Sequence, residues 1–390
     1  MAERRLLIVQ PWLGAFGHPA QSLLTLARAL GPRPDVEYLV SLNPGSELCE
    51  QSCRSLRQYG PVHVFGVDTL AADGNTVKAC AALVKLRLGG VRFRHVFFFD
   101  ASLPAIARYW PLIRWLGPAQ RLGVLHMHGP ELVSKNAKAL QRVSRLLADP
   151  AVSLYLRTDE LTQSWVELLG QAVPGAQIRT LPSLEIPDDP ALQSEAADAN
   201  RINGEFDGGP DDNFGGKLAF GIIGQIRVGK GIEWLVPAFV QQPQLGRLTV
   251  AGEFNTAETQ RQLALLQGYP GFIRSFMSEA EMLVLSRQQD YLLMLYEPWD
   301  GRMESAVLYL AARVGKPVVV YGDSWCGRMV REFGCGVVVP FEHARALAAL
   351  AALPRPGSSA YAELIAGVRR FRDAHSLAAL KPTIVHELLG

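Results

Sequence analysis

The sequence lacks the features of disulfide-stapled, metal-binding and membrane-spanning proteins. Its 390 residues include five cysteines, an odd number, and no CxxC pair, so we expect no disulfide framework and no zinc site, as in the reducing cytosol. No uncharged apolar stretch reaches the roughly 18 residues that a transmembrane helix needs. The apolar run after residues 1–5 has strand length and no small-residue cleavage site, which predicts a first strand rather than a signal peptide.

A strong excess of charge is also missing. The chain is 19% charged and 48% hydrophobic, with a net charge of +2. This near-neutral balance argues against a dedicated nucleic-acid-binding protein, and the length suits two ordinary globular domains. No GxGxxG motif with a following acid occurs, so a dinucleotide-dependent dehydrogenase is not favoured.

The least core-like part of the chain is residues 188–216. It contains eight acids against one arginine, with many Gly, Asn and Asp. Such a segment buries too little apolar surface to order itself, so it predicts a flexible acidic linker or insertion. It separates a first domain, residues 1–187, from a second half of similar size.

Both halves alternate strand-like and helix-like stretches. In the first half, RLLIVQPWL is strand-like, and HPAQSLLTLARALG is helix-like and ends at Gly31. In the second half, KLAFGIIG and GIEWLVPAFVQQ repeat this pairing. Continuous apolar strands alternating with helices predict parallel sheets covered on both faces. The predicted fold class is α/β, with two Rossmann-like domains facing a central cleft.

One β-loop-α-β unit, residues 291–323, has the pattern of a ligand site. An apolar strand leads into a loop with acids and one arginine, and a helix is expected to begin near Glu304 and Ser305. A turn, Gly315-Lys316-Pro317, then opens a second apolar strand. Open α/β folds bind ligands at the carboxyl ends of parallel strands, and free N–H groups at a helix N-terminus suit a phosphate.

The order of these segments resembles that of GT-B glycosyltransferases that use nucleotide sugars, of the group 1 or family 4 type. The segments are GIIGQIRVGKGIEWLVPAF, LTVAGEF, FMSEAEMLVLSRQQDYLLMLYEP and the Gly-Lys-Pro turn, over roughly residues 217–345. The first half is similar only in architecture and in one glycine-containing turn. The resemblance implies an acceptor domain at 1–187, a donor domain at 217–365, and C-terminal helices, 366–390, that cross back to the first domain.

The resemblance implies a site for the donor diphosphate. In the segment Gly224-Gln225-Ile226-Arg227-Val228-Gly229-Lys230-Gly231, Lys230 and its flanking glycines match the family pattern. Gln225 stands where the family usually has an arginine, and Arg227 is expected to supply that charge. The alternative is that Lys230 is a solvated loop lysine. Fixed cations stabilise a departing diphosphate, so we expect neither a metal nor another cofactor.

The acids of residues 291–323 depart from the family spacing. Many retaining members have two glutamates separated by seven residues, whereas six separate Glu297 from Glu304, and the second family position falls on Leu310. Glu297 is expected to contact the donor sugar or to lie at the rim. Glu304 either accepts from a ribose or sugar hydroxyl or caps the helix. The outcome, retaining or inverting, stays open. Further donor-binding candidates at the helix start are Arg302, Ser305 and Ala306.

Three residues at strand ends of the first half are candidates for a general base. Asp100 ends the buried run VFFFD, and His126 and His128 end RLGVLHMHG. Alternation along a strand predicts that both histidines share one face. An inverting enzyme needs a base to deprotonate the acceptor hydroxyl; in a retaining enzyme these residues would orient the sugar. A purely structural role is the alternative.

A glycine-containing turn, Gly14-Ala15-Phe16-Gly17-His18, follows the first strand. Glycine lets the backbone approach a ligand closely. By resemblance this loop lies under the transferred sugar or the acceptor, which makes Gly14, Gly17 and His18 binding candidates. The alternative for His18 is a position at a helix N-terminus with no chemistry.

Basic residues are concentrated in the first half, where residues 1–187 hold 20 Lys and Arg against 14 Asp and Glu, a surplus of 20 − 14 = 6. The segment Arg108–Arg121 (RYWPLIRWLGPAQR) combines this charge with Trp110 and Trp115. It is expected either to rest on an anionic membrane and present a lipid-linked acceptor to the site, or to pack its tryptophans in the core.

The predicted function is the metal-independent transfer of a sugar from a GDP- or UDP-sugar to a glycan or lipid-linked acceptor, in polysaccharide or glycoconjugate biosynthesis. Two alternatives remain open: a GT-B-type nucleotide-sugar epimerase, and a non-catalytic protein that binds nucleotide sugars or glycans. The expected location is the cytoplasm, with peripheral contact at the inner face of the cytoplasmic membrane. No nucleic-acid partner is expected.

Overall fold

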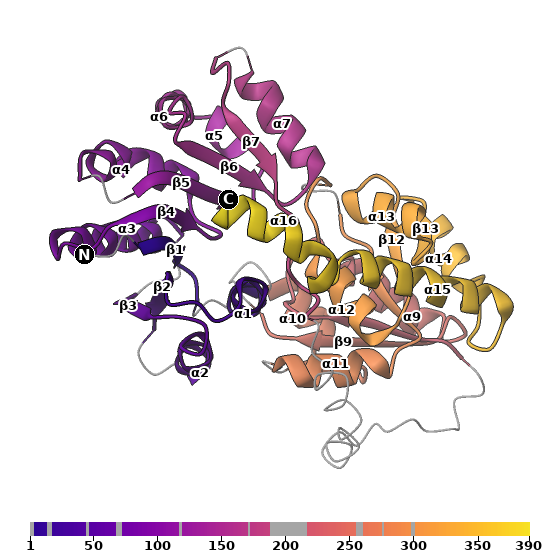
Figure 1. The fold of residues 1–390 in the computed structure, drawn as a ribbon. Coiled ribbons are helices and arrows are strands. Elements are labelled where there is room, and N and C mark those ends of the chain that lie inside the picture. Colours follow the sequence, from indigo (N-terminus) through magenta and orange to yellow (C-terminus); the bar gives the residue numbers. More distant parts are fainter. Residues whose placement is uncertain are drawn as a thin grey trace. The chain divides into compact units, whose positions relative to one another are not determined.

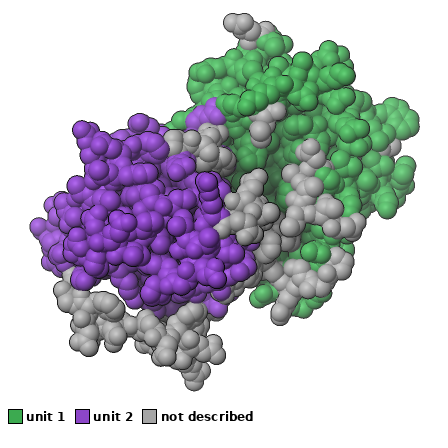
Figure 2. All heavy atoms as spheres, turned by 180° about the vertical axis from the view of Figure 1, so that it is seen from behind, with its two compact units in different colours: residues 1–187, 376–390 green, residues 188–375 purple. Residues whose placement is uncertain are grey.

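The structure is a computed structural model that forms two compact units (Figures 1 and 2). Unit 1 comprises residues 1–187 and 376–390, and unit 2 comprises residues 188–375. The predicted linker, together with Gly14 and Gly17, lies outside the described residues. Those are residues 4–13, 18–43, 47–67, 72–116, 119–170, 172–187, 217–254, 260–274, 277–297 and 301–390.

Unit 1 contains a seven-stranded parallel sheet with the order β3-β2-β1-β4-β5-β6-β7. Its strands are β1 (Arg4–Gln10), β2 (Val36–Leu42), β3 (Val62–Gly66), β4 (Phe93–Phe98), β5 (Ala119–His126), β6 (Val152–Leu156) and β7 (Gln177–Thr180). Its helices are α1 (His18–Leu30), α2 (Glu47–Leu56), α3 (Ala72–Leu88), α4 (Leu103–Leu116), α5 (Glu131–Ser134), α6 (Ala137–Leu147), α7 (Asp159–Leu169) and α16 (Leu377–Leu389).

Two helical layers cover the sheet of unit 1. α1 and α2 connect successive strands along the sheet from β1 to β3. α3, α4 and α6 connect successive strands in the opposite direction, from β3 to β6. Right-handed crossovers therefore place these two sets on opposite faces. α16 packs against α1, and α3 packs on α4, which packs on α6. In the core, Ile8 of β1 lies between Tyr38 of β2 and Phe97 of β4, and all three are fully buried.

Unit 2 contains a six-stranded parallel sheet with the order β10-β9-β8-β11-β12-β13. Its strands are β8 (Ala219–Ile223), β9 (Arg247–Gly252), β10 (Phe272–Arg274), β11 (Tyr291–Met294), β12 (Val318–Tyr321) and β13 (Gly336–Val339). Its helices are α9 (Ile232–Gln241), α10 (Gln260–Leu266), α11 (Glu279–Arg287), α12 (Ala306–Val314), α13 (Trp325–Phe333), α14 (His343–Ala351) and α15 (Ser359–Ala374).

The strand orders confirm the predicted α/β class with two Rossmann-like sheets. Each sheet reverses its order once, between β1 and β4 in unit 1 and between β8 and β11 in unit 2. Ligands of such folds bind at the carboxyl ends of the strands beside this reversal. Within the described part of the chain, no helix is long and apolar enough to cross a membrane.

The C-terminal boundary differs from the prediction. Residue 366 falls inside α15, which belongs to unit 2, and only residues from Ser376 onward belong to unit 1. Helix α16 buries Leu377, Ile384 and Leu388 in the core of unit 1, where it is coloured yellow among the indigo and magenta elements (Figure 1). The signal for the break between the two helices is Ser376, whose Oγ atom caps α16 by accepting from the N–H of Ala379.

Polar contacts also hold α16 in unit 1. The Nδ1 atom of His95 lies 3.1 Å from the carbonyl oxygen of Leu388, and Tyr155 and Arg179 both donate to the Glu387 carboxylate, at 3.1 and 2.8 Å. Burial lowers the pKa of His95 to about 4, so the ring is neutral near pH 7 and donates its proton to the carbonyl.

Unit 1 is therefore expected to lose stability in mild acid. An unfolded histidine titrates near 6.5 and buried His95 near 4, so the unfolded state takes up the proton first as the pH falls through this window. A drop of about 1.5 pH units below 6.5 should cost about 2 kcal/mol through this residue. Urea unfolding at several pH values should show a flatter pH profile for His95→Gln than for the wild type; equal slopes would contradict the assignment.

Candidate active site

The strongest candidate site lies where the sheet of unit 2 reverses its order. The loop after β8, from Gly224 to Gly231, and the residues that follow β11 both lie at the carboxyl edge of the sheet. The two segments are joined by a hydrogen bond from the Glu297 N–H to the Gly229 carbonyl, at 2.8 Å. The sequence therefore brings a basic loop and an acidic loop to the position where this fold binds ligands.

The loop after β8 requires glycine at its end. Gly231 has a φ of +75°, and a Cβ atom there would lie 2.7 Å from the carbonyl oxygen of Leu295. Because no larger side chain fits, the loop crosses tightly over the end of β11 before α9 begins. This close crossing turns the neighbouring Lys230 inward.

Lys230 is a buried cation. Only 6% of the residue is exposed, and its Nζ atom lies 5.9 Å from the centre of the Tyr296 ring. Burial, with a smaller contribution from Arg227, lowers the pKa of Lys230 to about 7. Within the described residues no carboxylate forms an ion pair with it. Such a buried ammonium group is costly unless an anion binds beside it, so the solvated-lysine interpretation is wrong.

Tyr296 joins Lys230 to the start of α12, and the sequence prediction missed it. Its ring faces Lys230, and its hydroxyl oxygen lies 3.4 Å from Oγ of Ser305. Burial raises the pKa of Tyr296 to about 12, so the hydroxyl stays protonated. The available signal was its place as the last aromatic residue of the run YLLMLYEP, directly before Glu297.

The start of α12 matches the prediction. Ser305 is the N-cap, with extended backbone angles, and its Oγ atom accepts from the N–H of Val307 at 3.4 Å. Ala306 is the first helical residue. The alternative that Glu304 caps the helix is not met, because Ser305 is the N-cap. The Oε2 atom of Glu304 accepts from the hydroxyl of buried Tyr309 at 2.8 Å.

The remaining donor-site candidates surround this centre. Arg227 is partly buried and close enough to Lys230 and Tyr296 to affect the pKa of each. Glu297 is exposed, and Arg302 is partly buried. In one unit the structure therefore brings together the basic loop, Tyr296 and the N-terminus of α12, which can bind a phosphate through N–H groups and fixed cations.

In unit 1, Asp100 has a salt-bridge partner. It follows β4 and has a φ of +53°, the only positive value for a non-glycine residue in the described part of the chain. Both its carboxylate oxygens accept from Nη2 of Arg157, at 3.1 and 3.2 Å, and both side chains are buried. A carboxylate held in this way is a weak proton acceptor, so the contacts favour a positioning role.

The two histidines differ in environment. His126 ends β5 and is buried, with Nδ1 3.2 Å from the carbonyl oxygen of Ala101, while its Nε2 has no partner among the described residues. Burial, and then the charge of His128, lower the pKa of His126 to about 4. Neutral His126 therefore presents Nε2 as an acceptor, suited to binding a hydroxyl group rather than to removing its proton.

His128 lies two residues beyond the end of β5, yet its ring lies beside that of His126, as expected for two side chains on one side of the chain. Its ring is exposed, and its centre lies 5.6 Å from that of His126. Its carbonyl oxygen accepts from Nε1 of Trp165 at 3.0 Å, which fixes the loop. His18 is the first residue of α1, and its binding role stays a prediction.

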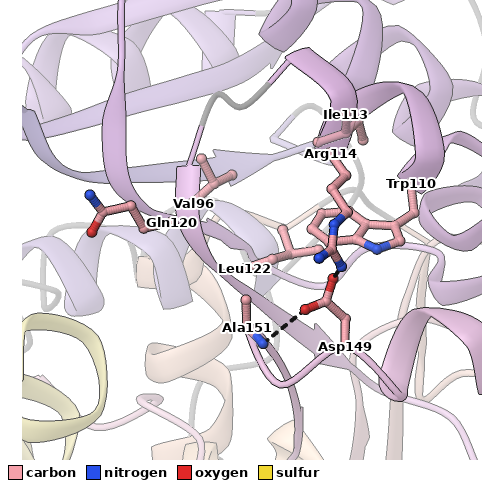
Figure 3. A pocket seen from close by; sticks show the side chains of 8 residues that line it. All are labelled: Val96, Trp110, Ile113, Arg114, Gln120, Leu122, Asp149 and Ala151. Carbon is pink, nitrogen blue, oxygen red and sulfur yellow. Dashed lines mark hydrogen bonds and ion pairs between the residues drawn. The ribbon is translucent and has the colours of Figure 1, made fainter.

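A separate cavity in unit 1 lies at the other edge of the sheet. It has a volume of about 180 Å³ and is bordered by Val96, Trp110, Ile113, Arg114, Gln120, Leu122, Asp149 and Ala151 (Figure 3). Arg114 forms an ion pair with Asp149, whose Oδ1 atom accepts from the N–H of Ala151 at 3.1 Å. Gln120 and Ala151 lie at the starts of their strands, so this cavity is remote from Asp100 and His126.

Chemically, the described residues show no constellation for a metal. No group of three or more His, Cys, Asp or Glu among them has a metal-binding arrangement. The five cysteines are free and buried.

Comparison with solved structures identifies the fold. HepE of Anabaena, in complex with UDP and glucose, has a TM-score of 0.67 at 12% identity, over 98% of this chain and 99% of that chain. An α,α-trehalose-phosphate synthase (UDP-forming) of Burkholderia vietnamiensis has a TM-score of 0.65 at 12% identity, over 98% and 99%. A glycosyltransferase of Rickettsia africae has 0.64 at 11%, over 100% and 98%.

These likenesses extend over almost the whole of each chain, so the fold is that of the GT-B glycosyltransferases, as the resemblance implied. No protein-family model matches the chain, and no curated protein matches it. At 11–12% identity these structures share the fold with this chain.

The lowered pKa of Lys230 predicts pH-dependent anion binding. Above about pH 7 the free protein loses the positive charge on Lys230, and binding a diphosphate then requires proton uptake. The affinity for inorganic pyrophosphate should therefore fall as the pH rises through 7, and calorimetry in buffers of different ionisation enthalpy should detect the proton uptake. Lys230→Arg should flatten the dependence, and an equal dependence in wild type and variant would exclude Lys230 as its source.

Proposed function

We propose that the protein is a glycosyltransferase that takes a sugar from a nucleoside-diphosphate donor. The observation that carries the proposal is the buried Lys230 ammonium, which has no carboxylate partner among the described residues and lies at the sheet reversal of unit 2. A diphosphate is the anion that suits this position, because the α12 N-terminus offers N–H groups at the same edge.

In the proposed reaction, the bond between the anomeric carbon and the diphosphate oxygen breaks. Its electron pair leaves with the diphosphate, and an acceptor hydroxyl oxygen forms the new bond as it loses its proton. Lys230 and Arg227 would stabilise the negative charge on the leaving group, while Ser305 and the N–H of Ala306 would hold a phosphate oxygen. Arg302 would add a further cation, and no metal is required in this scheme.

The acids of unit 2 are assigned to the donor's hydroxyl groups. Glu297 is exposed beside the loop after β8, where a carboxylate can accept from sugar hydroxyls. Glu304 receives the Tyr309 hydroxyl at 2.8 Å, which fixes its side chain for a ribose or sugar hydroxyl. This arrangement lacks the glutamate spacing of many retaining members, and the configuration of the product sugar distinguishes a retaining from an inverting reaction.

Unit 1 is assigned to the sugar hydroxyls and the acceptor. The unpartnered Nε2 of His126 can accept from a hydroxyl. The Asp100–Arg157 pair joins the ends of β4 and β6, the two strands that flank β5. Of the candidate bases, His128 has an exposed ring and is assigned the proton from the acceptor hydroxyl if transfer inverts the sugar. By the resemblance, Gly14, Gly17 and His18 are proposed for the same role.

A UDP-sugar is the first donor to test. HepE is described in complex with UDP and glucose, and the Burkholderia vietnamiensis protein as a UDP-forming synthase. GDP-sugars are the second choice. The proposed acceptor is a glycan or lipid-linked glycan in polysaccharide or glycoconjugate synthesis, and the proposed location is the cytoplasm, with peripheral membrane contact.

The experiment separates three functions in one assay. The protein is incubated with UDP-glucose or GDP-mannose and a panel of glycans, and products are analysed by mass spectrometry and by release of the nucleoside diphosphate. A mass increment on an acceptor supports transfer. An isomeric sugar formed without an acceptor indicates an epimerase. Nucleotide-dependent thermal stabilisation with no product from any donor contradicts transfer and favours a binding protein.

Lys230→Met should weaken UDP binding by roughly tenfold or more, since it removes a charge-assisted contact to the diphosphate. Lys316→Met is a matched control, because Lys316 is a partly buried lysine of the same unit, with a pKa lowered by burial, before β12 and away from the carboxyl edge. Titration calorimetry compares the two variants with the wild type. Similar losses in both would remove Lys230 from the site.

A further inference from the structure

Three neighbouring helices of one layer of unit 1 are rich in basic residues. Helices α3, α4 and α6 pack side by side. Their sequences contain eight Lys and Arg, three in α3, two in α4 and three in α6, and one acid, Asp73. Helices α1 and α2, which cover the opposite face of the sheet, contain two arginines and two glutamates. Helix α7, which connects β6 to β7 and so lies on the same side of the sheet as α3, α4 and α6, contains three acids and no Lys or Arg. The basic charge is thus confined to the part of this side formed by α3, α4 and α6.

Stabilisation of helix ends does not explain this charge. Basic residues in the last turn, such as Arg145 of α6, favour the helix dipole. Lys138, however, lies in the first turn of α6, where a cation is unfavourable, and Arg108 lies in the middle of α4. Arg114 is paired with Asp149. The exposed cations with no ion pair to a carboxylate of the described residues are Lys85, Arg108, Lys138, Arg142 and Arg145.

Large apolar side chains project from the same layer. Trp115 is 81% exposed, Leu88 is 74% exposed and Leu112 is 46% exposed. Leu88 ends α3, and Trp115 lies in the last turn of α4. Both helices run antiparallel to the strands, so these ends lie together at the amino edge of the sheet. Trp110, by contrast, borders the cavity behind α4 (Figure 3), so the predicted run Arg108–Arg121 has one inward and one outward tryptophan.

We propose that the face formed by α3, α4 and α6 binds an anionic lipid bilayer, with Trp115, Leu112 and Leu88 entering the interface. Each exposed Lys or Arg near an anionic bilayer contributes attraction, and tryptophan and leucine partition into the headgroup region. A nucleic acid would satisfy the charge but not the protruding aliphatic side chains. This inference deepens the proposed peripheral location, and its test does not depend on sugar transfer.

The position of this face sets a constraint on the acceptor. The exposed ends of α3 and α4 lie at the amino edge of the sheet, whereas Asp100 and His126 lie at its carboxyl edge. The 14 residues of α4 span about 21 Å between the two edges. The face therefore anchors unit 1 without covering the candidate acceptor residues. The expectation that Arg108–Arg121 itself presents a lipid-linked acceptor to the site is not supported by this geometry.

Sedimentation of the full chain with vesicles tests the proposal. Binding is expected to vesicles of phosphatidylcholine with phosphatidylglycerol, but not to phosphatidylcholine alone, and should weaken with added salt. Lys85→Glu with Arg108→Glu should bind at least roughly tenfold more weakly. Arg54→Glu with Arg57→Glu changes the net charge equally on α2 and the turn that follows it, and should bind like the wild type. Trp115→Ala should reduce binding without changing the response to salt.

Each variant is first checked for an unchanged circular dichroism spectrum and unchanged UDP binding, which separates loss of docking from loss of fold or of the donor site. Absence of phosphatidylglycerol-dependent binding in the wild type would overturn the proposal, as would equal losses in the two double variants. Retention of duplex or single-stranded nucleic acid by a wild-type protein that ignores vesicles would assign the face to nucleic acid instead.

Discussion

The candidate active site depends on one buried charge. Lys230 is held inside the crossing of two loops, with its Nζ atom over the ring of Tyr296 and no carboxylate partner among the described residues. A glycine at position 231 makes this crossing possible, since any larger side chain would meet the Leu295 carbonyl. Burial without a partner destabilises an ammonium group, and a bound diphosphate would reverse this. The close crossing at Gly231 therefore shapes the loop and also creates the preference of Lys230 for an anion.

A second consequence is that the site is preorganised. The Glu297 N–H bonds the Gly229 carbonyl, Tyr296 lies between Lys230 and the cap of α12, and Tyr309 fixes Glu304. Two segments that are distant in sequence, residues 224–231 and the residues after β11, therefore form one edge. Groups held in place before the ligand arrives need little reorganisation as charge develops on a leaving diphosphate.

The sequence predicted the features that are encoded locally. Parallel sheets, the break after Gly31 and the start of α12 at Ser305 follow from apolar runs and capping residues, and the structure confirms them. It did not predict Tyr296, the Asp100–Arg157 pair or the Glu304–Tyr309 hydrogen bond. The first and second of these depend on which strand ends become neighbours, and the third on a side-chain rotation. The C-terminal boundary lies at Ser376, which caps α16, and not at residue 366.

The most direct test of the central claim is the ionisation of Lys230 itself. Nuclear magnetic resonance of protein labelled at lysine Cε, with the signal assigned through Lys230→Arg, can follow its titration with and without UDP. The account predicts a lysine that titrates near pH 7 in the free protein and at a clearly higher pH with UDP bound. A Lys230 signal that titrates near 10.5, the ordinary value, or that UDP does not affect, would contradict it.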